Sequence, residues 1–233
     1  MPETKRFPSA TLLRAVLSLA AFNLLLGIVL FLSAGDIRWV AGWVFLAVFT
    51  VLTGPSIAYL WRVNPDIFVA RSKIHEGTKA WDKVILSLLV IAFFAIFPLA
   101  ALDAARFHWS TCPLWVMVVG YLMMTVGYLG SIWVYATNKF AEPSVRIQTE
   151  RRQTVVTNGP YKIVRHPLYM WSFFFVLGLP LALGSYWATI PGLIMTIILV
   201  VRTALEDRTL QAELQGYKEY AKRVRYRLIP GIW

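Results

Sequence analysis

The sequence predicts an all-α fold, a polytopic membrane helix bundle of about six transmembrane helices that forms a single domain over residues 1–233. Hydrophobic residues make up 58% of the chain and charged residues only 15%, which is unlike the composition of a soluble domain. The apolar residues are gathered in runs close to the roughly 20 residues that a helix needs to cross a bilayer. Neither an internal repeat nor a low-complexity linker interrupts these runs.

Six apolar runs are candidate membrane helices, and the first four of them lie within residues 1–136. They are Thr11–Ala34, Trp39–Leu60, Val84–Leu102, Leu114–Ala136, Leu168–Leu183 and Trp187–Ala204. Basic residues precede the first run, as in a signal peptide, but a run of about 20 residues exceeds the roughly 7–15 of a signal peptide's apolar core. We therefore expect the first run to be retained as a membrane helix.

The placement of lysine and arginine orients the predicted bundle. Of the 23 Lys and Arg residues, all but Arg38 and Arg106 fall on one side of the six-helix arrangement. Basic residues accumulate in cytoplasmic loops, so we expect both termini to be cytoplasmic. The net charge of +11 then indicates membrane lipids with anionic headgroups as partners and no nucleic acid, because the basic residues border apolar runs and form no separate basic domain.

Cys112 is the only cysteine, which excludes an intramolecular disulfide and a multi-cysteine metal site. The three histidines, His75, His108 and His166, belong to different loops and show no H-E-x-x-H-like spacing. We therefore expect no protein-bound metal.

The connection Thr137–Arg165 is longer than the roughly 12–15 residues beyond which loops are usually functional or disordered. Its β-branched residues and the turn signal Asn158-Gly159-Pro160 predict a short folded element, with Pro167 in the first turn of the next helix. Gly184-Ser185 then joins the last two predicted helices in a tight hairpin, in which Gly178, Pro180 and Gly192 allow close approach or a kink.

The charged tail after the sixth run carries an apolar stripe at intervals of three or four residues. Its members are Leu210, Leu214, Tyr217, Ala221 and Val224. This pattern predicts an amphipathic cytoplasmic helix that either lies on the lipid headgroups or covers a cytoplasmic site.

Charged residues gather at the cytoplasmic ends of the last two predicted helices. Arg165 and His166 directly precede the fifth helix, and Arg202 and Glu206, four residues apart, share one face of the sixth. Such residues beside membrane-length apolar runs are costly unless they are anchored at the interface or line a polar cavity. The alternative for Arg165 is that it only marks the cytoplasmic end of a helix. The alternative for Arg202 and Glu206 is a solvated ion pair that contributes only about 0.3–0.5 kcal/mol.

The motifs of this half of the chain resemble those of a known family. Asn158-Gly159-Pro160-Tyr161 precedes Arg165-His166-Pro167-x-Tyr169, and Glu206-Asp207-x-x-Leu210 precedes a tail with Tyr217, Tyr220 and Arg225. In this order, over roughly Asn138–Trp233, the motifs resemble the isoprenylcysteine carboxyl methyltransferase family and its relatives among the phospholipid methyltransferases.

The resemblance implies an integral membrane methyltransferase that uses S-adenosylmethionine, with residues 137–233 as the cofactor-binding catalytic half. The residues implied to line the cofactor site are Tyr161, His166, Tyr169 and Glu206. Arg165 and Arg202 are implied to neutralise carboxylates of the cofactor or acceptor, so the expected catalytic residues are Arg202, Glu206 and Arg165. The family often has two glutamates where this chain has Glu206-Asp207, which leaves the role of Asp207 open.

The acceptor that the resemblance implies is a lipid-like or prenylated carboxylate at the cytoplasmic membrane face. Methyl transfer from a sulfonium to a carboxylate annihilates charge, so a water-poor site favours it, and an ionised carboxylate needs only alignment. Alternative acceptors are a phospholipid amine or a small thiol, which must also lose a proton. A second alternative is a sterol-type membrane reductase with a nicotinamide cofactor. A transporter would place charges or broken helices near mid-membrane, where the sequence pairs none.

Cysteine accessibility tests the predicted topology. With Cys112 replaced by serine, single cysteines introduced at residues 3 and 231 should both react with a membrane-impermeant maleimide from the cytoplasmic side alone. Labelling of the two positions from opposite faces would show an odd number of spans.

Overall fold

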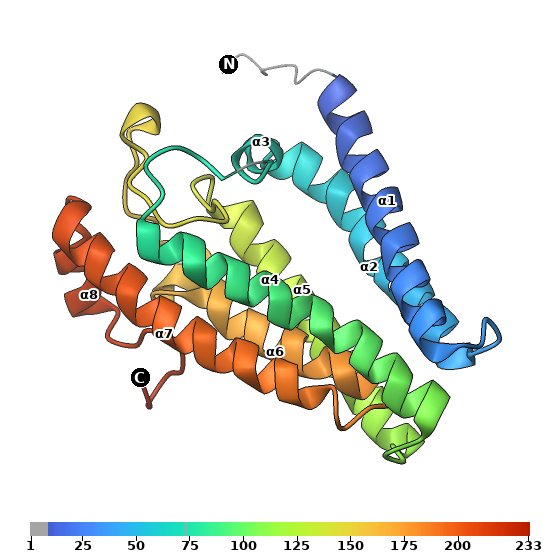
Figure 1. Cartoon of the computed structure of the whole chain (residues 1–233). Helices are drawn as coiled ribbons and strands as arrows, with labels where there is room; N and C mark the ends of the chain where they lie inside the picture. Colours follow the sequence, from blue (N-terminus) through green and yellow to red (C-terminus); the bar gives the residue numbers. More distant parts are fainter. Residues whose placement is uncertain (1–8, 73) are drawn as a thin grey trace.

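The computed structural model describes residues 9–72 and 74–233, and the regular elements in these ranges are all helical (Figure 1). Helices long and apolar enough to cross a membrane are α1 (Ser9–Ala34), α2 (Val40–Val63), α4 (Ala80–Ala101), α5 (Leu114–Thr137) and α7 (Thr189–Glu213). A π-helix, η1 (Leu102–Phe107), continues α4, and α6 (Pro167–Ala182) is a shorter apolar helix. The predicted helical membrane bundle is thus confirmed, with a sixth helix shorter than the other five.

The length of α6 is set by residues at its two ends. Pro167 occupies the first turn, as predicted, because a helix tolerates proline where no backbone N–H is needed. At the other end, Gly184 has a φ of 79°, and Ser185 N donates to Pro180 O at 3.0 Å, which closes the helix in a Schellman-type turn. Sixteen residues span about 24 Å, less than the roughly 30 Å of a bilayer core.

Helices α5 and α6 form the tightest pair in the bundle, because glycines replace side chains at their interface. A Cβ on Gly127 would lie 2.3 Å from Phe175 N, and one on Gly178 would lie 2.5 Å from Met124 N. Small residues let membrane helices approach in this way. The expected close approach at Gly178 is confirmed, but it is made against α5. A Cβ on Gly192 would meet its nearest neighbour at an ordinary 3.5 Å, so the expected tight hairpin of α6 with α7 does not depend on this glycine.

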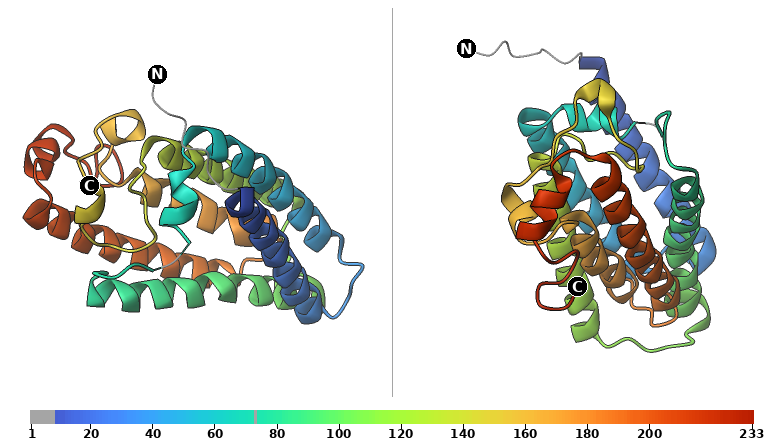
Figure 2. Two further views of the ribbon diagram at one scale, coloured as in Figure 1. Left: turned by 90° about the horizontal axis from the view of Figure 1, so that it is seen from above. Right: turned by 90° about the vertical axis from the view of Figure 1, so that its left-hand side faces the viewer.

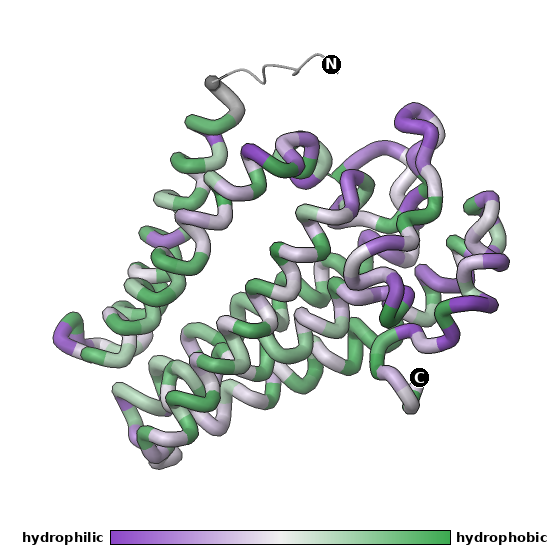
Figure 3. Tube along the Cα trace, turned by 180° about the vertical axis from the view of Figure 1, so that it is seen from behind, coloured by the Kyte–Doolittle hydropathy of each residue, from purple (hydrophilic) through white to green (hydrophobic). Residues whose placement is uncertain are grey.

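The polar segments gather at one end of the bundle, here named the polar end, where α4 and α6 begin and α5 and α7 end (Figures 1 and 3). Figure 2 shows the C-terminal segment at this end and the α1–α2 connection at the other. A short helix, α3 (Asp66–Ala70), and the loop 138–166, with its 3-10 turns η2 (Thr149–Arg151) and η3 (Gly159–Lys162), also lie at the polar end. The expected folded element in this loop is therefore two short helical turns.

The predicted tail helix is interrupted. Helix α7 ends at Glu213, Gly216 has a φ of 80°, and a separate helix, α8 (Tyr217–Arg223), follows. The apolar stripe faces the interior of the protein, where its members Leu214 and Tyr217 form a cluster with Tyr220 and residues of the loop. The tail thus covers the polar end, which agrees with the second of the two expected roles.

Substitution of Gly127 tests the α5–α6 contact. Gly127→Ala should lower the free energy of unfolding by about 1–3 kcal/mol, because the new methyl group meets backbone atoms that cannot move aside. A thermal-shift measurement in detergent checks this. Gly54→Ala in α2 is the matched control, since a methyl group at Gly54 would have no atom within 4 Å, and it should leave the melting temperature unchanged or slightly raised. Equal effects of the two substitutions would contradict the proposed packing.

Candidate active site

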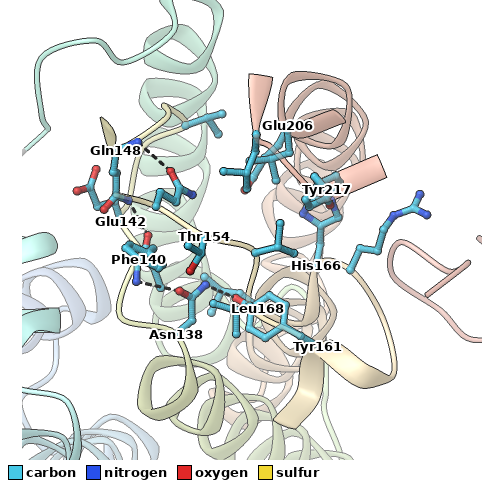
Figure 4. A pocket seen from close by; sticks show the side chains of 18 of the residues that line it. Asn138, Phe140, Glu142, Gln148, Thr154, Tyr161, His166, Leu168, Glu206 and Tyr217 are labelled. Atoms are coloured by element: carbon cyan, nitrogen blue, oxygen red, sulfur yellow. Dashed lines mark hydrogen bonds between the residues drawn. The ribbon is translucent and has the colours of Figure 1, made fainter. Parts of the chain in front are cut away.

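A pocket opens at the polar end between the loop 138–166, the first turn of α6, the end of α7 and α8. It encloses about 830 Å³ of empty space, its open mouth included. Figure 4 shows side chains of the loop on one side of it and side chains of α6, α7 and α8 on the other. Five of the six predicted site residues line this pocket, namely Tyr161, Arg165, His166, Tyr169 and Glu206.

Asp207 organises the wall formed by α6, α7 and α8. Its carboxylate is fully buried and lies 2.9 Å from Arg165 Nε and 2.9 Å from Arg227 Nε. His166 Nε2 lies 3.3 Å from Oδ1, and the Tyr217 hydroxyl donates to the same oxygen at 3.1 Å. A buried charge needs such partners, since desolvation is costly without them. Asp207 is therefore a structural anchor for the site.

The guanidinium of Arg165 also holds the tail. Its Nη1 donates to the carbonyl oxygens of Ala221, Val224 and Arg225 at 3.1–3.3 Å, where helix α8 ends. The backbone adds to this contact, because Arg165 N donates to Tyr226 O at 3.0 Å. Together these bonds fix the end of α8 against the start of α6.

Glu206, next to Asp207 on α7, has a different environment. It is half-buried and lines the pocket, where it accepts a short hydrogen bond from the Tyr169 hydroxyl. No basic side chain of the described residues forms an ion pair with it. The pocket therefore contains a carboxylate that has no direct ion-pair partner among the described residues.

Tyrosines surround this carboxylate. Burial raises the pKa of Tyr161 above its ordinary value, and burial followed by the charges of Asp207 and Glu206 raises the pKa of Tyr217. Both phenols therefore stay protonated at physiological pH. The ring of Tyr169 stacks on that of His166, with centroids 6.0 Å apart. The wall thus offers neutral hydroxyl groups and aromatic faces to a ligand.

Arg202 lies outside the pocket lining, in contrast to the other predicted residues. Its Nε donates to Asp82 Oδ1 of α4 at 2.8 Å and its Nη2 to Pro143 O at 2.6 Å. The guanidinium lies over the Tyr169 ring, 5.4 Å from its centroid. The solvated ion pair with Glu206, which was the alternative interpretation of Arg202, is not formed among the described residues, where Arg202 pairs with the buried Asp82.

The loop wall is held by its own polar network. Glu142, whose side chain is 1% exposed, accepts two hydrogen bonds from Arg146, at 2.7 and 2.9 Å. Asn138 Nδ2 donates to the Tyr161 hydroxyl at 2.7 Å, which joins the end of α5 to η3 (Figure 4). These loop residues, and Asp82, were not predicted as site residues. The sequence did offer a signal for Asp82, which is an acidic residue in the charged connector before an apolar run.

Removal of the Asp207 charge tests its role as an anchor. Asp207→Asn keeps the shape but leaves the buried guanidinium of Arg165 and the partly exposed one of Arg227 without their carboxylate. Loss of one partner of a buried pair costs about 3–5 kcal/mol. We expect a large drop in melting temperature. Arg208→Ala, at the exposed neighbouring position, is the control and should stay within about 0.5 kcal/mol of the unchanged protein. Similar melting temperatures for both variants would contradict the anchor.

Known proteins resemble the part of the chain that builds this pocket. Residues 115–215, from α5 to just beyond α7, match the family model described as Phospholipid methyltransferase. The cobalt-zinc-cadmium resistance protein CzcN of Cupriavidus metallidurans is 31% identical over 134 residues, which cover 54% of this chain and 56% of the relative. The nickel-cobalt-cadmium resistance protein NccN of Alcaligenes xylosoxydans xylosoxydans is 26% identical over 163 residues, 68% of this chain and 65% of the relative.

The aligned segments thus span less than two thirds of each relative's length. The family match covers less than half of this chain, but it contains the residues of α6 and α7 that line the pocket. The half of the protein that forms the candidate site is therefore similar to phospholipid methyltransferases, which belong to the integral membrane methyltransferases.

Proposed function

We propose that the protein is an S-adenosylmethionine-dependent methyltransferase that acts on a lipid-like acceptor at the cytoplasmic face of the membrane. The match of residues 115–215 to the phospholipid methyltransferase family supports the reaction class. The position of the pocket supports a membrane acceptor, because it lies where the membrane-length helices α5 and α7 end. The orientation toward the cytoplasm rests on the distribution of lysine and arginine.

The observation that carries the proposal is the carboxylate of Glu206 in a pocket walled by tyrosines. A cationic ligand group gains from a carboxylate without a counter-ion and from aromatic faces. When bound, S-adenosylmethionine supplies a methyl group on a positively charged sulfur. The residues that would hold it are Glu206, Tyr161, His166 and Tyr169, with Tyr217 of α8 as a further wall residue.

The two arginines fit a different role from the one that the resemblance implies. Arg165 and Arg202 already have the internal carboxylates Asp207 and Asp82 as partners. In this arrangement they fix the walls of the pocket, and alignment of the acceptor falls to those walls. Such positioning is a large part of catalysis for a group transfer between two bound molecules.

A lipid-like or prenylated carboxylate is the acceptor that the motifs favour, whereas the family match favours the amine of a phospholipid. A second cavity beside the pocket offers a place for the acceptor. It lies at the polar ends of α2 and α5, and shares Phe140 and Thr154–Val156 with the pocket. Both a cation, Lys139, and an anion, Asp66, line it, so it suits a polar headgroup of either kind.

The names of the relatives refer to metal resistance. In residues 9–72 and 74–233, three or more of the side chains that commonly bind metals do not come together. For this chain we propose methyl transfer, on the family match of residues 115–215.

Ligand binding and turnover test the proposal. The purified protein should bind S-adenosylmethionine in calorimetry and transfer a labelled methyl group to extracted membrane lipids. Glu206→Ala should lower turnover by at least about tenfold, or roughly 1.4 kcal/mol, because the charge in the pocket is lost. Lys218→Ala, exposed on α8, is the control and should be normal. Saturable binding of a reduced nicotinamide without any response to S-adenosylmethionine would instead support the reductase alternative.

A further inference from the structure

Arg202 has two acidic residues within reach and pairs with only one. Arg202 and Glu206 are separated by one helical turn on α7, a spacing at which opposite charges usually pair. Yet the guanidinium binds Asp82 of α4 in a bidentate contact, with Nε–Oδ1 at 2.8 Å and Nη2–Oδ2 at 3.1 Å. Asp82 is fully buried and Arg202 is 6% exposed. In the described residues no ion pair joins Arg202 to Glu206.

Hydrogen bonds to the loop support the pairing of Arg202 with Asp82. Asp82 Oδ2 also accepts a hydrogen bond from Val145 N at 2.7 Å, and Arg202 Nη2 donates to Pro143 O at 2.6 Å. The acid and the base therefore each hold one end of the segment 143–145, of which Ser144 and Val145 line the pocket. Bidentate arginine–carboxylate pairs with further hydrogen bonds are the stable form of a buried ion pair.

The consequence concerns the charge inside the pocket. Because Arg202 pairs with Asp82, Glu206 has no ion-pair partner among the described residues and has the Tyr169 hydroxyl as its hydrogen-bond donor. Tyr169 lies between Arg202 and Glu206. Its ring lies under the Arg202 guanidinium, and its hydroxyl donates to Glu206.

We propose that Asp82 is a positioning residue that holds Arg202 away from Glu206 and so preserves a negative charge in the pocket for a cationic ligand. This inference rests on the proposed function. It makes Asp82 a determinant of the preference for the sulfonium cofactor S-adenosylmethionine over its neutral thioether product, S-adenosylhomocysteine. The two molecules differ in the methyl group and the positive charge at sulfur. The ratio of their affinities therefore measures how strongly the protein stabilises a positive charge at the sulfur.

Substitution Asp82→Asn removes the charge but keeps an oxygen that can accept from Val145 N. Arg202 is then a buried cation without its anion, and Glu206 is the nearest alternative on its own helix. We expect the affinity for S-adenosylmethionine to fall by about tenfold, while that for S-adenosylhomocysteine changes by less than about twofold. Calorimetry measures both. Asp82→Glu retains the charge and should keep the preference for the sulfonium.

Lys79→Ala is the matched control, because Lys79 and Glu213 form a second ion pair between the α4 and α7 ends, 2.7 Å long and partly exposed. It should leave both affinities unchanged. Equal losses for the two ligands in Asp82→Asn would show a merely structural role, and behaviour like that of Lys79→Ala would show no role. Either result overturns the inference.

A melting experiment without ligand separates this inference from the proposed function. In the unchanged protein, Glu206→Gln should alter the melting temperature little. In the Asp82→Asn background it should clearly lower the melting temperature, because Glu206 is then the nearest anion on the same helix as Arg202. This coupling is expected even if the protein binds no S-adenosylmethionine. Additive effects of the two substitutions would overturn the inference, whereas coupling without cofactor binding would overturn only the proposed function.

Discussion

The buried carboxylate of Asp207 is the constraint on which the polar end depends. It receives Arg165 and His166 from the start of α6, Tyr217 from α8 and Arg227 from the C-terminal segment. These segments are distant in sequence and carry several positive charges. A single buried anion lets them converge, because the buried guanidinium of Arg165 would be too costly without it. The pocket exists where this convergence leaves space beside the loop.

The adjacent acidic residues Glu206 and Asp207 of α7 therefore have different roles. Successive helical residues point about 100° apart, so Asp207 faces α8 and the tail while Glu206 faces the pocket. Asp207 forms ion pairs with Arg165 and Arg227, whereas Glu206 forms none with the described residues. A third acid, Asp82, binds the arginine that would otherwise pair with Glu206. Asp207 and Asp82 thus bind arginines of the walls, and Glu206 faces the ligand space without an ion-pair partner among the described residues.

Much of this arrangement follows from the sequence. The apolar runs located the membrane-length helices, and the motif residues Tyr161, His166 and Tyr169 do line one pocket. The sequence could not show which acid Arg202 selects, because spacing within a helix indicates local pairs and Asp82 lies 120 positions away. It also could not show the break at Gly216, since the apolar stripe continues across it. Contacts between segments that are distant in sequence determine both the pairing of Arg202 and the break at Gly216.

The most direct measurement is an experimental structure of the protein purified with S-adenosylhomocysteine. The account predicts density for the ligand in the pocket between the loop 138–166 and α8, with its sulfur close to the carboxylate of Glu206 and Arg202 still bound to Asp82. Density for the ligand elsewhere, or a pocket in which Arg202 pairs with Glu206 beside the sulfur, would contradict it.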